Sequence, residues 1–183
     1  MRPTPLLPVL ALFLPLIAAA KPEVIISLQE RHLYVIDQDE IIAKYPVGVG
    51  KPRTPTPPGT YRVTSVTAKP TWTVPESIMR GPHPPRAKRI PPGKGNPLGA
   101  YFLRLNGSAY GIHGTIAPQL LPGAVSAGCV RMRNQDVSAL AKLVAIGTDV
   151  TILTERYSEP EPEEATPKSP LIYSTEEPPL PPN

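Results

Sequence analysis

The chain contains a single cysteine, Cys129, and a histidine, His113, that lies sixteen positions before it. A cysteine acts as a nucleophile through its thiolate, and a nearby imidazole is a common base for removing the thiol proton. His113 ends a stretch that predicts a β-strand, and the loop of about 15 residues that follows can bring the two side chains together. Gly128 directly before the cysteine allows a tight backbone and close approach of a substrate. The pair therefore predicts covalent catalysis by a cysteine.

The lone cysteine has a second interpretation, because free cysteines are also common as small buried hydrophobic residues. Residues 1–20 have the features of a signal peptide, with a positive start, an apolar run and small residues before Lys21. We therefore expect export to the periplasm or cell wall, with an uncleaved membrane anchor as the alternative. One cysteine cannot form an internal disulfide, so an exported free thiol should be either buried or chemically employed.

Short strands separated by polar turns must position this pair. Each predicted strand is rich in β-branched residues or alternates between apolar and polar side chains. The predicted strands are 23–28, 32–37, 40–47, 60–67, 101–105, 109–112 and 149–153. The dipeptide Asn106-Gly107 predicts a hairpin turn between the fifth and sixth strands. His113 lies at the end of the sixth strand, so this hairpin is expected to carry the histidine.

One helix is predicted, over about 134–146. Asn134 is the expected N-cap and Gly147 the expected stop, and the apolar residues with helical spacing are Val137, Leu140, Ala141 and Val144. Residues 69–100 are rich in proline and predict loops. The predicted fold class is therefore mostly β, with one packed helix, in a single domain over residues 21–156.

Composition separates this domain from a tail. Residues 157–183 carry six Glu and one Lys with few large apolar side chains, so they predict a disordered segment. Residues 21–156 carry a net charge of +8, which suits an anionic polymer outside the membrane, although such a charge can also serve solubility alone. Nucleic acid is the other common polyanion, and the signal peptide argues against it.

The segment Ile112-His113-Gly114-Thr115, followed after a loop by Ser-Ala-Gly-Cys-Val-Arg-Met at 126–132, resembles the signature of the L,D-transpeptidases, the YkuD-type catalytic domain. The blocks TPTPPGTY at 54–61, PTW at 70–72 and PPGKGNPLG at 91–99 resemble further parts of that family. The resemblance covers about residues 23–154. Many family members have histidine at the position of Ala127, so this chain lacks an imidazole there.

The resemblance implies an L,D-transpeptidase-like β-sandwich or barrel and an acyl-transfer reaction. Cys129 would attack the carbonyl of the bond between the L-centre and the D-centre of a tetrapeptide stem, release the terminal D-alanine and form a thioester. An amine would then take the acyl group. His113 would serve as base and acid, and the Gly114 carbonyl would orient its imidazole. Backbone N–H groups near Gly128 and Cys129 would stabilise the oxyanion.

Further residues are expected to contact the substrate. Arg131 has the geometry to bind a carboxylate, and it could equally be a structural arginine that donates to loop carbonyls. Trp72 and Tyr110 could line a groove or belong to the core. Ser126 and Gly128 complete the predicted substrate-binding set.

Three functions remain open at this stage. The first is transfer to a second stem peptide or an acceptor protein, the second is hydrolysis of the same thioester as in an L,D-carboxypeptidase, and the third is non-catalytic wall binding. The third is disfavoured because His113 and Cys129 are both present. A zinc peptidase is disfavoured because the three histidines lack ligand spacing, and a serine hydrolase because Ser126 lies outside a G-x-S-x-G motif. We therefore expect no metal or cofactor, and a monomer that acts on peptidoglycan stem peptides.

Overall fold

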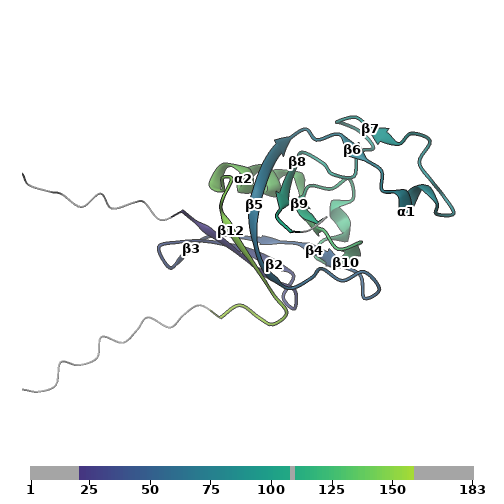
Figure 1. The fold of residues 1–183 in the computed structure, drawn as a ribbon. Coiled ribbons are helices and arrows are strands. Elements are labelled where there is room, and N and C mark those ends of the chain that lie inside the picture. Colours follow the sequence, from purple (N-terminus) through teal and green to yellow (C-terminus); the bar gives the residue numbers. More distant parts are fainter. Residues whose placement is uncertain (1–20, 108–109, 159–183) are drawn as a thin grey trace, which may run out of the picture.

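A ten-stranded, strongly curved sheet forms the body of the protein (Figure 1). The computed structural model describes residues 21–107 and 110–158, so the predicted signal peptide and all of the predicted tail after Ser158 lie outside the described residues. The strand order is β10-β4-β11-β9-β8-β5-β12-β1-β2-β3. The strands are β1 (Glu23–Ser27), β2 (His32–Asp37), β3 (Glu40–Pro46), β4 (Gly48–Gly50), β5 (Gly59–Ala68), β8 (Tyr101–Leu105), β9 (Gly111–His113), β10 (Gly123–Ser126), β11 (Val130–Arg131) and β12 (Asp149–Leu153).

The predicted mostly β fold is confirmed, and the strands 32–37, 101–105 and 149–153 have the predicted bounds. The predicted strand 40–47 is wrong at its end, because β3 stops at Pro46 and the N–H of Val47 donates to the Arg31 carbonyl at 2.8 Å. The sixth strand is shifted to Gly111–His113, and His113 is its last residue, so the predicted position of this histidine at the end of a strand is confirmed.

The predicted helix is shorter than expected and begins differently. Helix α2 spans Asn134–Leu143, and Val144 is already extended with φ −112° and ψ 156°. Asn134 is the first helical residue and Arg133 occupies the N-cap position, so the predicted Asn134 cap is wrong. The Asn134 amide instead binds backbone groups of Ala100 and Thr115, which explains why it is not used as a cap.

The hydrophobic core lies between α2 and the sheet. Val137 and Leu140 of α2 are fully buried, and α2 lies against β8 and β9. On β8, β9 and β11 and directly after β11, the fully buried large side chains are Leu103, Ile112, Val130 and Met132. Each buried aliphatic side chain contributes roughly 1.5–3 kcal/mol. The strands that carry the predicted catalytic residues are therefore held from behind by a packed helix.

An arm with little regular structure projects from the sheet between β5 and β8 (Figure 1). It contains a small two-stranded sheet of β6 (Trp72–Thr73) and β7 (Arg89–Ile90), and the single-turn helix α1 (Glu76–Met79). The buried side chain of Asn96 holds the base of the arm, because its amide donates to the carbonyls of Pro70 at 2.8 Å and Pro91 at 3.1 Å. Trp72 of the arm lines the two cavities that are described below.

The last described residues return to the first hairpin. The Ser27 hydroxyl donates to the Glu155 carbonyl at 2.7 Å, and the N–H of Tyr157 donates to a Glu30 carboxylate oxygen at 3.1 Å. The ring of Tyr157 lies 5.0 Å from that of Tyr34, centroid to centroid. Tyr157, which was predicted to belong to the tail, is therefore in contact with the folded domain. Among the described residues, no helix is long and apolar enough to cross a membrane.

Candidate active site

His113 and Cys129 are brought together by the pairing of two short strands. Strand β11 pairs in parallel with β9, with Val130 opposite Ile112 and Arg131 opposite His113. The N–H of Met132 donates to the His113 carbonyl at 2.8 Å and extends this pairing. Cys129 directly precedes β11 and therefore lies beside the start of β9, where a backbone N–H of Gly111 points at its thiol.

Both side chains line one cavity of about 340 Å3. Six of the eight residues predicted for the site line it, namely Trp72, Tyr110, His113, Ser126, Cys129 and Arg131. Gly114 and Gly128 do not line it. Trp72 comes from the arm and Tyr110 from the segment before β9, and both are half-buried. Trp72 and Tyr110 therefore line a groove, as in the first of the two interpretations, and are not buried in the core.

The imidazole of His113 is buried, with 4% of the residue exposed. Its Nδ1 lies 2.6 Å from the carbonyl oxygen of Gly114. A carbonyl can only accept, so Nδ1 carries the proton, and Nε2 of the neutral ring has the free lone pair. The pKa of His113 is lowered from its ordinary value of 6.5 to about 4. Burial is the main cause, the Gly114 and Pro97 carbonyls oppose it, and the nearby Arg131 charge adds to it. The ring is therefore neutral at pH 7 and able to accept a proton.

Burial also raises the pKa of the Cys129 thiol above its ordinary value. The N–H of Gly111 and the positive charges of Arg131 and Arg104 oppose this effect by favouring the thiolate. The resting pair is thus a neutral thiol with a neutral imidazole.

A tight turn before Cys129 is held by Ser126. The Ser126 hydroxyl donates to the Cys129 carbonyl at 2.5 Å and accepts from the N–H of Gly128 at 3.0 Å. The Gly128 N–H is therefore engaged, which argues against its predicted part in an oxyanion hole and leaves the Cys129 N–H as the predicted donor. Gly128 has φ +116°, and a Cβ there would lie 2.8 Å from Cδ1 of Tyr110. Only glycine fits this position without strain.

Arg131 lines the cavity beside Cys129 and is half-buried. Its Nε is buried and has no hydrogen-bond partner among the described residues. A structural arginine that donates to loop carbonyls would have a partner there. At its Nε, Arg131 therefore lacks the partner that the structural interpretation expects.

Asn134 holds the peptide next to the carbonyl that orients His113, a part that was not predicted from the sequence. Its Oδ1 accepts from the N–H groups of Ala100 at 3.0 Å and Thr115 at 3.2 Å, and its Nδ2 donates to the Thr115 carbonyl at 3.0 Å. Gly99 packs directly against the same peptide, since a Cβ there would lie 2.8 Å from the carbonyl carbon of Gly114. In the sequence, an asparagine at the start of a helix predicts an N-cap. Asn134 was therefore predicted to cap the helix, and its bonds to Ala100 and Thr115 were missed.

A second cavity, of about 330 Å3, meets the first at Cys129. Trp72, Pro75 and Leu98 also line both cavities. The second cavity contains Arg104, which lies over the ring of Phe102 at 5.4 Å. Arg104 was not predicted as a site residue, because nothing in the sequence distinguishes it from any exposed residue of a strand.

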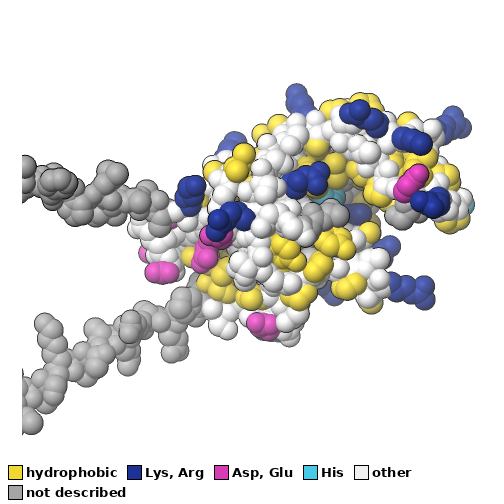
Figure 2. Space-filling model, viewed as in Figure 1, with side chains coloured by type: hydrophobic (Ala, Val, Ile, Leu, Met, Phe, Trp, Pro, Cys, Tyr) yellow, Lys and Arg dark blue, Asp and Glu magenta, His cyan; other side chains and the backbone are white. Residues whose placement is uncertain are grey.

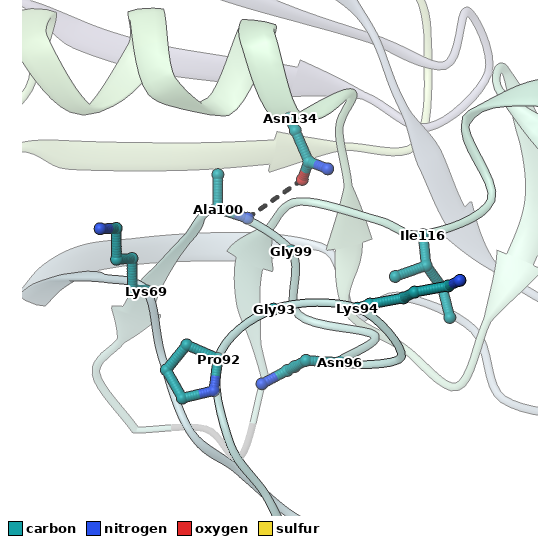
Figure 3. A pocket seen from close by; sticks show the side chains of 9 residues that line it. All are labelled: Lys69, Pro92, Gly93, Lys94, Asn96, Gly99, Ala100, Ile116 and Asn134. Atoms are coloured by element: carbon teal, nitrogen blue, oxygen red, sulfur yellow. Dashed lines mark hydrogen bonds between the residues drawn. The ribbon is translucent and has the colours of Figure 1, made fainter.

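Another cavity, of about 640 Å3, is lined by Asn96, Gly99 and Ala100 together with residues of the neighbouring loops (Figure 3). None of the residues predicted for the site lines it. Figure 3 shows Asn134 bonded to the backbone of Ala100 at its upper edge. The two asparagine amides in its wall bind groups within the protein, and the charged side chains that line it are Lys69 and Lys94. No group of three His, Cys, Asp or Glu side chains that could hold a metal ion is found among the described residues.

Comparison with known proteins agrees with this geometry. The profile of the YkuD family, the L,D-transpeptidase catalytic domain, matches residues 21–152. The chain belongs to this family. It is 38% identical over 127 residues to a relative from Bacillus licheniformis named as an L,D-transpeptidase, YkuD, with 69% of this chain and 62% of that protein covered. It is 36% identical over 138 residues to YbiS of Escherichia coli strain K12, also named as an L,D-transpeptidase, with 72% and 44% covered.

Solved structures show the same fold. An L,D-transpeptidase from Mycobacterium smegmatis superposes with a TM-score of 0.60 at 17% identity, over 73% of this chain and 59% of that one. A cysteine-to-serine mutant of Enterococcus faecium L,D-transpeptidase gives a TM-score of 0.58 at 19% identity, over 73% and 50%. The family resemblance inferred from residues 112–115 and 126–132 is thereby confirmed. This L,D-transpeptidase domain makes up most of the chain, and the chain spans about two thirds or less of the relatives' length.

Proposed function

We propose that the protein is a peptidoglycan L,D-transpeptidase that works through a thioester at Cys129. The observation that carries the proposal is the bond from Nδ1 of His113 to the Gly114 carbonyl, which leaves Nε2 as a base in the cavity that also contains Cys129. Nε2 removes the thiol proton as the sulfur attacks the carbonyl carbon of the bond between the L-centre and the D-centre of a tetrapeptide stem. The tetrahedral intermediate collapses, the C–N bond breaks, and the protonated His113 returns its proton to the leaving amine of D-alanine.

The second half of the reaction runs through the same groups. The amine of an acceptor attacks the thioester carbonyl, Nε2 takes a proton from that amine, and the Cys129 sulfur leaves and is reprotonated. Water in place of the amine would give a carboxylate and a shortened stem. The two cavities that meet at Cys129 support transfer, because the acyl group can occupy one while an acceptor enters the other.

The surface supports an anionic polymer as the substrate. Figure 2 shows Lys and Arg side chains spread over the arm and the neighbouring part of the sheet, while most Asp and Glu lie at the other end. The exposed cations of the arm are Lys69, Arg80, Arg86, Lys88, Arg89 and Lys94, against the single acidic residue Glu76. Such a surface raises the local concentration of a polyanion and its rate of association. Stem peptides in an anionic wall are therefore suitable partners.

The experiment that tests the proposal uses isolated tetrapeptide muropeptides. The wild-type protein should give a cross-linked dimer that has lost one D-alanine, whereas a hydrolase would give tripeptide monomers alone. Cys129→Ala should give neither product, and the acyl-enzyme mass should appear on the wild type and not on this variant. Full activity of Cys129→Ala would refute the enzyme mechanism. Export, which we infer from residues 1–20, is tested by fractionation of cells that express the full chain with and without this segment.

A further inference from the structure

Cys129 lies on the border of two cavities with different chemistry. The first contains His113 and Arg131, and the second contains Arg104 and does not reach His113. The two cavities share Cys129 and the apolar wall made by Trp72, Pro75 and Leu98. Among the described residues that line the two cavities, none is acidic. Each cavity therefore offers one guanidinium to a negatively charged substrate group.

The position of His113 decides which part of the substrate each cavity can hold. The leaving amine receives a proton from His113 and the attacking amine gives one to it, so both must come within hydrogen-bond reach of this imidazole. Both amines therefore lie in the cavity that contains His113 and Arg131. The part of the donor stem that stays attached to Cys129 must then lie in the second cavity, which contains Arg104.

Arg104 is held in place by the sheet and by an aromatic ring. In the pairing of β8 with β9, Arg104 lies opposite Gly111, whose N–H points at the Cys129 thiol. The guanidinium carbon lies 5.4 Å from the centre of the Phe102 ring, a contact that restricts the side chain while leaving its N–H groups available. The only ion pair among the described residues joins Arg62 and Asp149, so Arg104 has no acidic partner within this part of the protein.

We propose that Arg104 determines specificity for the acyl donor by binding a carboxylate of the stem segment that remains on Cys129. The proposal rests on the proposed function, since it requires the thioester. Arg104 supplies a planar pair of N–H donors on the donor side of the thiol, which matches a carboxylate and not its neutral amide. The favoured donor is thus a stem with a free carboxylate near the reacting carbonyl, and amidation of that carboxylate makes the stem a poor donor.

The test compares two synthetic tetrapeptides that differ only at the side-chain carboxyl group of the third residue, which is free in one and amidated in the other. D-Alanine release and the acyl-enzyme mass are followed in single turnovers. The wild type should react roughly tenfold faster with the free carboxylate, and Arg104→Gln should bring the ratio of the two rates close to one. Arg104→Lys, which keeps the charge without the planar fork, should give an intermediate ratio.

The ratio separates recognition from other effects of the substitution. Loss of the Arg104 charge also raises the pKa of the Cys129 thiol, but this slows both peptides equally and cancels in the ratio. Arg53→Gln removes the same charge from an exposed turn after β4 and should leave the ratio at the wild-type value. Equal rates of the two peptides in the wild type, or an unchanged ratio in Arg104→Gln, would overturn the proposal. Failure of the wild type to form an acyl-enzyme with either peptide would instead overturn the proposed function.

Discussion

Protonation of His113 should destabilise the folded protein by a predictable amount. The pKa of this buried imidazole is lowered from 6.5 to about 4, mainly because the ring is buried. Above pH 6.5 the imidazole is neutral in both states, and protonation does not lower the free energy of unfolding. As the pH falls below 6.5, the unfolded chain takes up the proton first, so the free energy of unfolding falls. The loss is complete once the pH is below about 4. A pKa difference of one between the folded and unfolded chains is worth about 1.36 kcal/mol, so the full loss is about 3 kcal/mol.

Urea unfolding at several pH values between about 7.5 and 3.5 measures this loss. Carboxylates also titrate over this range, so the informative quantity is the free energy of unfolding of the wild type minus that of His113→Gln at each pH. This difference should fall by about 3 kcal/mol from the top of the range to the bottom, with most of the change between about pH 6 and 4. In parallel, the acid limb of kcat/KM should lie near pH 4. A difference that stays constant within about 0.5 kcal/mol would refute the neutral, buried imidazole.

Three substitutions test the parts that position the catalytic pair. Gly128→Ala should cost roughly 1–3 kcal/mol of stability and strongly reduce kcat, because φ is +116° and the new methyl group meets the Tyr110 ring; urea unfolding and turnover measure the two effects. Asn134→Ala removes the amide that holds Ala100 and Thr115, so kcat should fall with little change in KM, and stability should fall by about 1–3 kcal/mol. Leu140→Ala empties part of the core behind β8 and β9 and should cost about 2–5 kcal/mol in urea unfolding, with kcat per folded molecule unchanged.

Results that contradict these expectations are equally clear. A fully active, stable Gly128→Ala protein would show that the turn before Cys129 is not constrained by Tyr110. An unchanged kcat in Asn134→Ala would show that the Gly114 carbonyl is held without this amide. A Leu140→Ala protein as stable as the wild type would place the helix outside the cooperative core.

Longer strands can be predicted because apolar and polar side chains alternate along them, with the apolar ones on the buried face. In 149–153, Val150 and Ile152 point into the core and alternate with exposed or half-buried neighbours, so the period of two is visible in the sequence. The short strands β4, β10 and β11 span two to four residues and contain no such period. Their pairing depends on partners far away in the chain, and the parallel pairing of β11 with β9 is what places Cys129 beside Gly111.

The helix illustrates a different limit. Its apolar residues predicted the helix correctly, but its end was placed three residues too late because Val144 fits the helical spacing. The N–H of Ala145 donates to the Thr148 hydroxyl at 3.1 Å, which turns the chain into β12 before Gly147 is reached. Side-chain hydrogen bonds of this kind compete with helix formation and leave little trace in an apolar pattern.

The sequence by itself determined the family and the candidate nucleophile and base, because a single cysteine, a histidine before it and the blocks around them are properties of residue type and order. Only the tertiary structure decided that the pKa of His113 is lowered and that of Cys129 is raised, because both shifts come mainly from burial. It also decided that Ser126 closes a turn, that Asn134 holds the peptide behind His113, and that Arg104 lines a cavity with Cys129. These are contacts between strands and loops distant in sequence, and such contacts exist only once the sheet has formed.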